Sequence, residues 1–129
     1  MAITLETSAR DAACDAIVDL IDAGAGAGTL EFKSADSSVA GTNEVATVTF
    51  SDPVFGASSS GTATANAITD DTNATGGTAA TFTIFDSNSA AVFRGSVSTS
   101  GADINISSVA IGATDTVSIS SLTATMPAS

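Results

Sequence analysis

Residues 80–97, ATFTIFDSNSAAVFRGSV, decide the fold because they consist of two strand-like runs joined by a polar turn. In the first run Phe82 and Ile84 alternate with threonine, and a period of two is typical of a half-buried strand. The polar stretch DSNSA between the runs is typical of a hairpin connection. We therefore predict a hairpin with strands at 80–85 and 91–97, and with one apolar face that lies in a core.

The same alternation recurs along the chain and predicts further short strands. We expect them at 29–33, 44–51, 62–68, 104–106, 109–111 and 116–126. In the last of these runs the apolar residues change parity at Ser120 and Ser121, which indicates either a β-bulge or a strand that crosses between two layers. About seven short strands predict a mainly β fold, an antiparallel β-sandwich or a partly open barrel with one N-terminal helix packed on it.

That single helix is predicted over residues 8–22, SARDAACDAIVDLID. Ser8 is placed to cap it, its body is rich in alanine, and the run AGAGAG at 23–28 ends it. Cys14 lies among apolar neighbours of the helix, so we expect a small buried residue and no reactive thiol. One cysteine also excludes an intramolecular disulfide.

The chain of 129 residues is expected to form a single domain, 1–129. Residues 1–7 form either an N-terminal arm or a first strand, and residues 29–126 form the β-rich body. The composition, 43% hydrophobic and 13% charged residues, does not match that of a disordered chain.

Four carboxylates, those of Asp11, Asp15, Asp19 and Asp22, share one side of the predicted helix. Like charges at this spacing repel each other by about 0.2–0.5 kcal/mol per pair, and the last two lie at the helix end that disfavours negative charge. Two interpretations remain open. The stripe is either a solvated face, where salt screens the repulsion, or a docking face for a basic surface on a partner.

The charge balance excludes several classes of partner. Fourteen acidic residues against three basic ones give a formal net charge of −11, which repels both a phosphate backbone and an anionic membrane. We therefore expect no nucleic acid and no membrane as a partner. The N-terminal region lacks the pattern of a secretory signal, and no run approaches the roughly 18 apolar residues of a membrane span, so we expect synthesis in a cytoplasm.

The residue types that most catalysis needs are missing. The sequence has no histidine, tryptophan or tyrosine, which removes the commonest general base and every Ser-His or Cys-His nucleophile. We therefore expect no enzyme activity and no cofactor. The only lysine, Lys33, shares a strand face with Glu31, which predicts a surface ion pair.

Residues Asp71 to Gly76, DTNATG, match the first half of a calcium loop. Phe82 stands where that loop would carry its bidentate glutamate. A hydrated turn explains the same residues, and both interpretations remain open.

Three segments carry a resemblance that spans most of the chain. They are ARDAACDAIVDLIDAGAGAGTLEF at 9–32, VATVTFSDPVFGASSSGTATANAIT at 45–69 and DINISSVAIGATDTVSISSLTATMP at 103–127. In order and layout they resemble small structural proteins of tailed bacteriophages, of the head decoration or cement type. The resemblance implies a virion protein on the outer surface of the capsid, bound to the major capsid protein, self-associated as a homotrimer, and stabilising contacts between capsid subunits.

On this basis the first candidate partner-binding residues are Ile3 and Leu5, which precede the helix. An ordinary first strand of the domain's own sheet is the alternative for them. The second candidates are the helical carboxylates Asp11, Asp15, Asp19 and Asp22. Two other functions stay open, a tail, neck or host-recognition component of a virion and a cell-surface adhesive or carbohydrate-binding β module, although the lack of Trp and Tyr disfavours sugar stacking.

Overall fold

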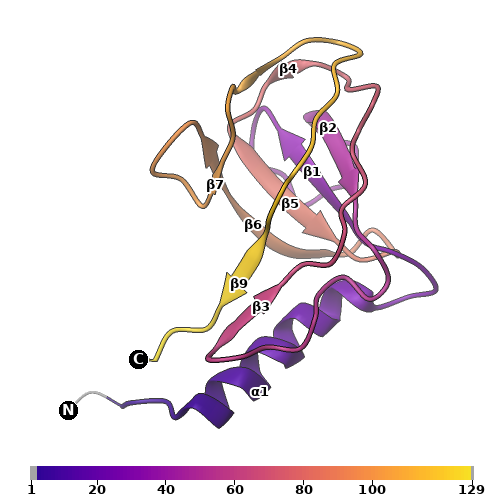
Figure 1. Ribbon diagram of the computed structural model, residues 1–129. Coiled ribbons are helices and arrows are strands. Elements are labelled where there is room, and N and C mark those ends of the chain that lie inside the picture. The colour runs from indigo at the N-terminus through magenta and orange to yellow at the C-terminus, as the bar shows by residue number, and fades with distance from the viewer. Residues whose placement is uncertain (1–2, 129) are drawn as a thin grey trace.

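The computed structural model describes residues 3–128 and is mainly β with one N-terminal helix, as the sequence predicts (Figure 1). The helix α1 spans Thr7–Val18 and continues as one turn of 3-10 helix, η1, at Asp19–Asp22. In the described part of the chain nine strands follow: β1 (Thr29–Lys33), β2 (Glu44–Thr49), β3 (Thr62–Thr64), β4 (Gly77–Thr78), β5 (Thr81–Phe85), β6 (Ala91–Ser98), β7 (Ile104–Asn105), β8 (Ala110–Ile111) and β9 (Thr123–Thr125).

Five of these strands form the main sheet, in the order β2-β1-β5-β6-β7, and the sheet curls into a half-barrel. The predicted hairpin is confirmed as β5 and β6, which pair antiparallel with Phe82 opposite Gly95. A Cβ atom at Gly95 would lie only 2.6 Å from Cε1 of Phe82, so glycine leaves the space that the ring fills. Of the two predicted architectures the partly open barrel is the one observed. Its pairs are not all antiparallel, because β6 and β7 run parallel.

Strand β1, which lies between β2 and β5, is buried on both faces. On one face Leu30 pairs with Val48 on β2 and with Ile84 on β5, and all three side chains are buried in the core. The other face carries Glu31 and Lys33, which would meet water in an uncovered sheet. Residues 34–43, which connect β1 to β2, fold back over these two side chains.

The ion pair between Lys33 and Glu31 is therefore buried, and the prediction of a surface pair is wrong. Lys33 is 0% exposed, with its Nζ atom 3.5 Å from Oε2 of Glu31. Nζ donates hydrogen bonds to the carbonyls of Val39 (3.0 Å) and Thr42 (2.7 Å), and Glu31 Oε1 accepts one from the Gly41 N–H (2.8 Å). Both charges thus satisfy backbone groups of the 34–43 loop, which is the reason that the loop closes over them.

The helix packs on a second, smaller layer formed by the antiparallel pair β3 and β9 (Figure 1). Cys14 is buried there, as predicted, and its thiol donates to the carbonyl of Ala124 (3.4 Å). The predicted cap at Ser8 is wrong. The helix begins at Thr7 with Glu6 as its N-cap residue and no side-chain cap, so Ser8 lies inside the first turn.

The C-terminal segment does not form the single strand predicted at 116–126. Val117 pairs with Asp71, the chain bends at Ser120, and β9 then pairs with β3. Of the two interpretations of the parity change, the β-bulge is wrong, and the segment instead passes from the half-barrel to the helix layer. On both sides of the parity change the apolar side chains stay half-buried against the core, and Ser120 and Ser121 are exposed between them.

Removing the cation of the buried ion pair should cost much more stability than removing the cation of the exposed ion pair. Lys33→Met leaves the Glu31 carboxylate buried without its cation, so we expect a loss of about 3–5 kcal/mol in the free energy of unfolding, measured by urea denaturation. Adding Glu31→Leu should recover part of that loss because no charge then remains buried. The control is Arg94→Met, which removes the exposed pair of Arg94 with Asp36 and should cost less than about 1 kcal/mol. Equal losses for the two single variants would contradict the assignment.

Candidate functional site

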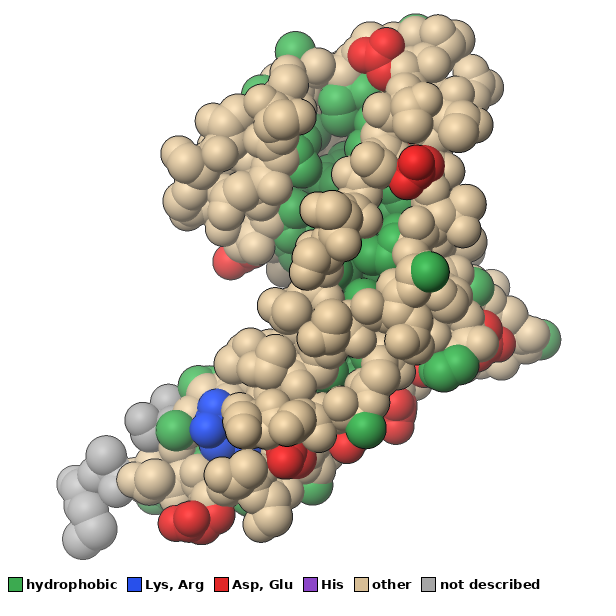
Figure 2. Space-filling view, in the orientation of Figure 1, with side chains coloured by type: hydrophobic (Ala, Val, Ile, Leu, Met, Phe, Trp, Pro, Cys, Tyr) green, Lys and Arg blue, Asp and Glu red, His purple; other side chains and the backbone are tan. Residues whose placement is uncertain are grey.

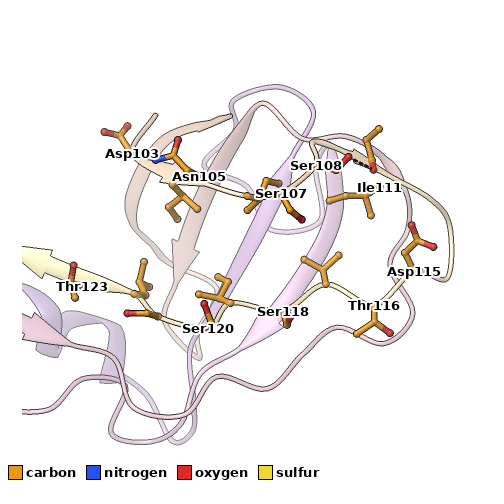
Figure 3. A pocket seen from close by; sticks show the side chains of 17 residues that line it. Asp103, Asn105, Ser107, Ser108, Ile111, Asp115, Thr116, Ser118, Ser120 and Thr123 are labelled. Atoms are coloured by element: carbon orange, nitrogen blue, oxygen red, sulfur yellow. Dashed lines mark hydrogen bonds between the residues drawn. The ribbon is translucent and has the colours of Figure 1, made fainter. Parts of the chain in front are cut away.

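A hollow lies at the open side of the half-barrel, and we call it the edge groove. Its walls belong to the segments 103–111 and 115–123, and its volume is about 560 Å³. Figure 3 shows these two segments facing each other across it, one running through β7 toward β8 and the other toward β9. Figure 2 shows apolar side chains at the bottom of a hollow in the upper half of the view.

One wall of the edge groove is an unpaired sheet edge. β7 is the last strand of the main sheet, and its partner β6 occupies one side only. The opposite edge of the sheet, β2, is covered by the chain itself: Thr49 pairs with Thr69, and the Gly76 N–H donates to the Val45 carbonyl (3.0 Å). The described backbone hydrogen bonds include none between the two walls of the groove. β7 is thus left with a free row of backbone donors and acceptors.

The lining of the groove is apolar at its base and polar at its rim. Ile104 and Ile111 are buried, whereas four further aliphatic side chains are only half-buried: Ile106, Val117, Ile119 and Leu122. The rim carries serine, threonine and asparagine together with Asp103 and Asp115. The lining contains no aromatic residue and none of the three basic residues. Such a surface has nothing that stacks on a sugar or neutralises a phosphate.

Asp103 is held in its charged form by its neighbour across the β6–β7 pair. The Ser96 backbone N–H (2.9 Å) and its hydroxyl (3.0 Å) both donate to Oδ2 of Asp103. These two bonds hold the pKa of Asp103 below its ordinary value of 3.8. The carboxylate is therefore negative throughout the neutral range. Asp115, on the other wall, accepts the Gly112 N–H at its Oδ2 (2.7 Å).

Ile3 and Leu5, the first predicted partner-binding residues, lie on an extended arm that forms no strand between residues 3 and 6. Of the two predictions for residues 1–7, the arm is therefore observed over its described part, and residues 1–2 lie outside it. Ile3 is 77% exposed and Leu5 37% exposed. The Leu5 N–H donates to the carbonyl of Ala128 (2.6 Å), which ties the base of the arm to the other end of the chain. Both side chains are available to a partner.

The acidic stripe is used within the chain. Asp15 accepts the Ser58 N–H (2.8 Å), Asp11 accepts the Gly61 N–H (2.6 Å) and Asp22 accepts the Val54 N–H (2.8 Å). The interpretation as a solvated face is wrong for these three half-buried residues, because the 54–61 segment lies against them. Only Asp19 is exposed. The stripe fastens the segment between β2 and β3 to the helix, and little of it remains free for a partner.

Asp71, the first residue of the segment that matches half of a calcium loop, is likewise used in the fold. Asp71 accepts the Thr47 N–H at Oδ2 (2.8 Å) and the Asn73 N–H at Oδ1 (2.9 Å). Over residues 3–128 no cluster of three or more Asp, Glu, Cys or His side chains is arranged to hold a metal ion. The turn interpretation is the one that this geometry supports, and the Asp71 carboxylate joins the 71–76 loop to β2.

The edge groove was not predicted from the sequence, although one feature of the sequence is related to it. The alternating segment 103–127 supplies both walls, and its parity change marks the place where the chain leaves the half-barrel. Comparison of the chain with protein-family models, with curated proteins and with solved structures returned no match. In the described residues, no helix has both the length and the apolar character needed to cross a membrane.

The carboxylate stripe predicts that helix residues one turn apart differ in their contribution to stability. Asp11→Ala and Asp15→Ala each remove an acceptor from a backbone N–H and should lower the free energy of unfolding by about 1–2 kcal/mol. Asp19→Ala, the matched control on the same helical side, should produce no measurable loss, because its side chain accepts no hydrogen bond in the described structure. Thermal and urea denaturation measure all three, and equal effects would contradict the fastening role.

Asp103 predicts a local pH dependence. Because its pKa is lowered in the folded state, its bonds to Ser96 contribute stability above the ordinary pKa, and that contribution is lost as the pH falls through the lowered value. Ser96→Ala removes the hydroxyl donor and keeps the backbone donor, so the pKa should rise while staying below 3.8. NMR titration of the carboxyl carbon measures this, with Ser100→Ala as the control that leaves it unchanged.

Proposed function

We propose that this protein is a structural component that works by contacting other proteins, and specifically a capsid decoration protein of a tailed bacteriophage. In this proposal it binds the outer surface of the head, contacts the major capsid protein, associates as a homotrimer and stabilises the junctions between capsid subunits. The resemblance of the three segments at 9–32, 45–69 and 103–127 supports the choice of a virion. The observation that carries the proposal is the edge groove, an apolar hollow beside free backbone groups.

A groove of this composition suits polypeptide better than any small substrate. Free backbone groups of an edge strand pair with another strand, and half-buried aliphatic side chains bind apolar ones. The carbohydrate alternative lacks a stacking platform: the sequence has no Trp or Tyr, and its six phenylalanines are buried or half-buried. Protein contact is therefore the function that this surface supports best.

Weak contacts suffice for a protein of this kind because they are repeated. On an icosahedral shell each copy meets the same surface, and association between copies turns later contacts into intramolecular ones. Avidity of this kind can exceed the single-site affinity by a factor of about 10²–10⁴. The sparsely charged surface of small Ser, Thr and Ala residues agrees with such contacts.

The proposal predicts the abundance of the protein in purified virions. A decoration protein should approach the major capsid protein in copy number, as measured by quantitative mass spectrometry of intact particles. A copy number limited to a few per particle would overturn the proposed function and favour a tail, neck or host-recognition component.

The exposed arm predicts a second effect, on attachment to shells. Ile3→Ser combined with Leu5→Ser removes two apolar side chains from the arm, so occupancy on purified expanded shells should fall severalfold while the melting temperature stays unchanged. The matched control is Val39→Ser, which removes an apolar side chain that is 61% exposed in the 34–43 loop. Undiminished occupancy in the arm variant would contradict an anchoring role for Ile3 and Leu5.

A further inference from the structure

We propose that the edge groove accepts an extended segment of a partner protein as an added β-strand on β7, and that this segment carries Lys or Arg at its two ends. The inference rests on the proposed function in one respect, that the protein acts by contacting other proteins. It deepens that function by naming the chemistry of the bound segment and the strand that receives it.

The free edge of β7 is the first reason. The Ile106 N–H donates to the Ser98 carbonyl (2.9 Å) on the β6 side. Backbone groups of successive residues in a strand point to alternate sides, so those of Asn105, the last residue of β7, point away from β6. Ser107 follows β7 in a bend of the chain. No backbone hydrogen bond of the described chain involves the Asn105 or Ser107 amide on that side. These are the donors that an added strand would meet.

The apolar base of the groove is the second reason. A strand added to β7 places every other side chain toward the base, where Ile106, Val117 and Ile119 are half-buried. Val117 already uses its own N–H and C=O on Asp71, so the 115–123 wall offers side chains there. An occupant with apolar residues at alternate positions would complete the burial of these three.

Charge decides which occupant fits. Figure 3 shows Asp103 and Asp115 at opposite ends of the stretch of lining residues, and each uses Oδ2 for a bond within the chain. Neither carboxylate forms a salt bridge within the described part of the chain. Lys33 is buried, Arg94 pairs with Asp36 (3.1 Å), and the Arg10 Nε donates to the Met126 carbonyl (3.0 Å). A cation at each end of the bound segment would therefore meet a carboxylate.

A second copy of the chain fits this groove less well. The described arm, ITLE at residues 3–6, has apolar side chains at alternate positions, but it brings the Glu6 carboxylate toward Asp103 or Asp115. A basic segment of a different protein does not have this disadvantage.

The test uses the full chain and synthetic peptides. The probe is a capped fluorescent peptide in which valine and threonine alternate between two terminal lysines, and its control has glutamate in place of both lysines. Fluorescence anisotropy should show binding of the lysine peptide at least about tenfold tighter than the glutamate peptide, weakening as salt is raised. Equal affinity of the two peptides, or no binding of either, would overturn the proposal.

Hydrogen exchange locates the peptide without any variant. The Asn105 and Ser107 amides should exchange at least about tenfold more slowly in the presence of saturating lysine peptide, because an added strand accepts their hydrogen bonds. Binding without protection of these two amides would overturn strand addition on β7.

Two sets of variants separate the backbone contribution from the charge contribution. Ser107→Pro removes the edge N–H and should weaken the lysine peptide about tenfold or more, whereas Ser107→Ala keeps that N–H and should bind as the wild type does. Asp103→Asn with Asp115→Asn should erase the preference for lysine over glutamate, and Asp19→Asn, an exposed carboxylate outside the groove, should preserve it. Identical binding by the proline and alanine variants would overturn the role of the β7 edge.

Two further outcomes keep this inference distinct from the proposed function. If a peptide of residues 3–8 of this chain binds more tightly than the lysine peptide, the occupant is a second copy and the inference is wrong. If the lysine peptide fails to bind while virions contain the protein in high copy number, the inference is wrong and the proposed function stands. If the lysine peptide binds while virions contain only a few copies of the protein, the inference stands and the proposed function is wrong.

Discussion

Backbone hydrogen bonding at the two edges of one sheet is the constraint on which this structure depends. Each strand edge exposes donors and acceptors that must find partners. At β2 the chain supplies them, because residues 69–76 return along that strand and bond to Val45, Thr47 and Thr49. At β7 the following segment turns away to pair with β4 and then with Asp71. The half-barrel is closed on one side by its own loop and left open on the other.

Charged side chains accept many of the backbone hydrogen bonds that the strands do not provide. Many strands of this fold are only two or three residues long, so long stretches of chain lie outside any ladder. Asp11, Asp15 and Asp22 accept N–H groups of the 54–61 segment, and Asp86 accepts the N–H groups of Asn88 and Ala90 in the β5–β6 turn. The acidity of the chain is in part a set of internal hydrogen-bond acceptors.

Lys33 and Glu31 extend this principle to a buried face. A charge removed from water is costly unless it is paired and hydrogen-bonded, and here both charges meet the backbone of the 34–43 loop as well as each other. The pair therefore holds the 34–43 loop, which has no regular secondary structure, over one face of the main sheet. With that face covered and the β2 edge closed, the side at β7 remains open, and the function proposed above assigns contact with other proteins to this side.

The sequence by itself determined the local structure. Alternation of apolar and polar residues placed the β5–β6 hairpin and β1, and helical spacing placed α1 with Cys14 in the interior, because these patterns depend on neighbours along the chain. Only the tertiary structure decided that Lys33 is buried, that Asp11 and Asp15 bond to a distant loop, and that β7 has a free edge. Those outcomes depend on segments dozens of residues apart coming together, and a periodic pattern shows which side of an element is apolar but not which segment will cover it.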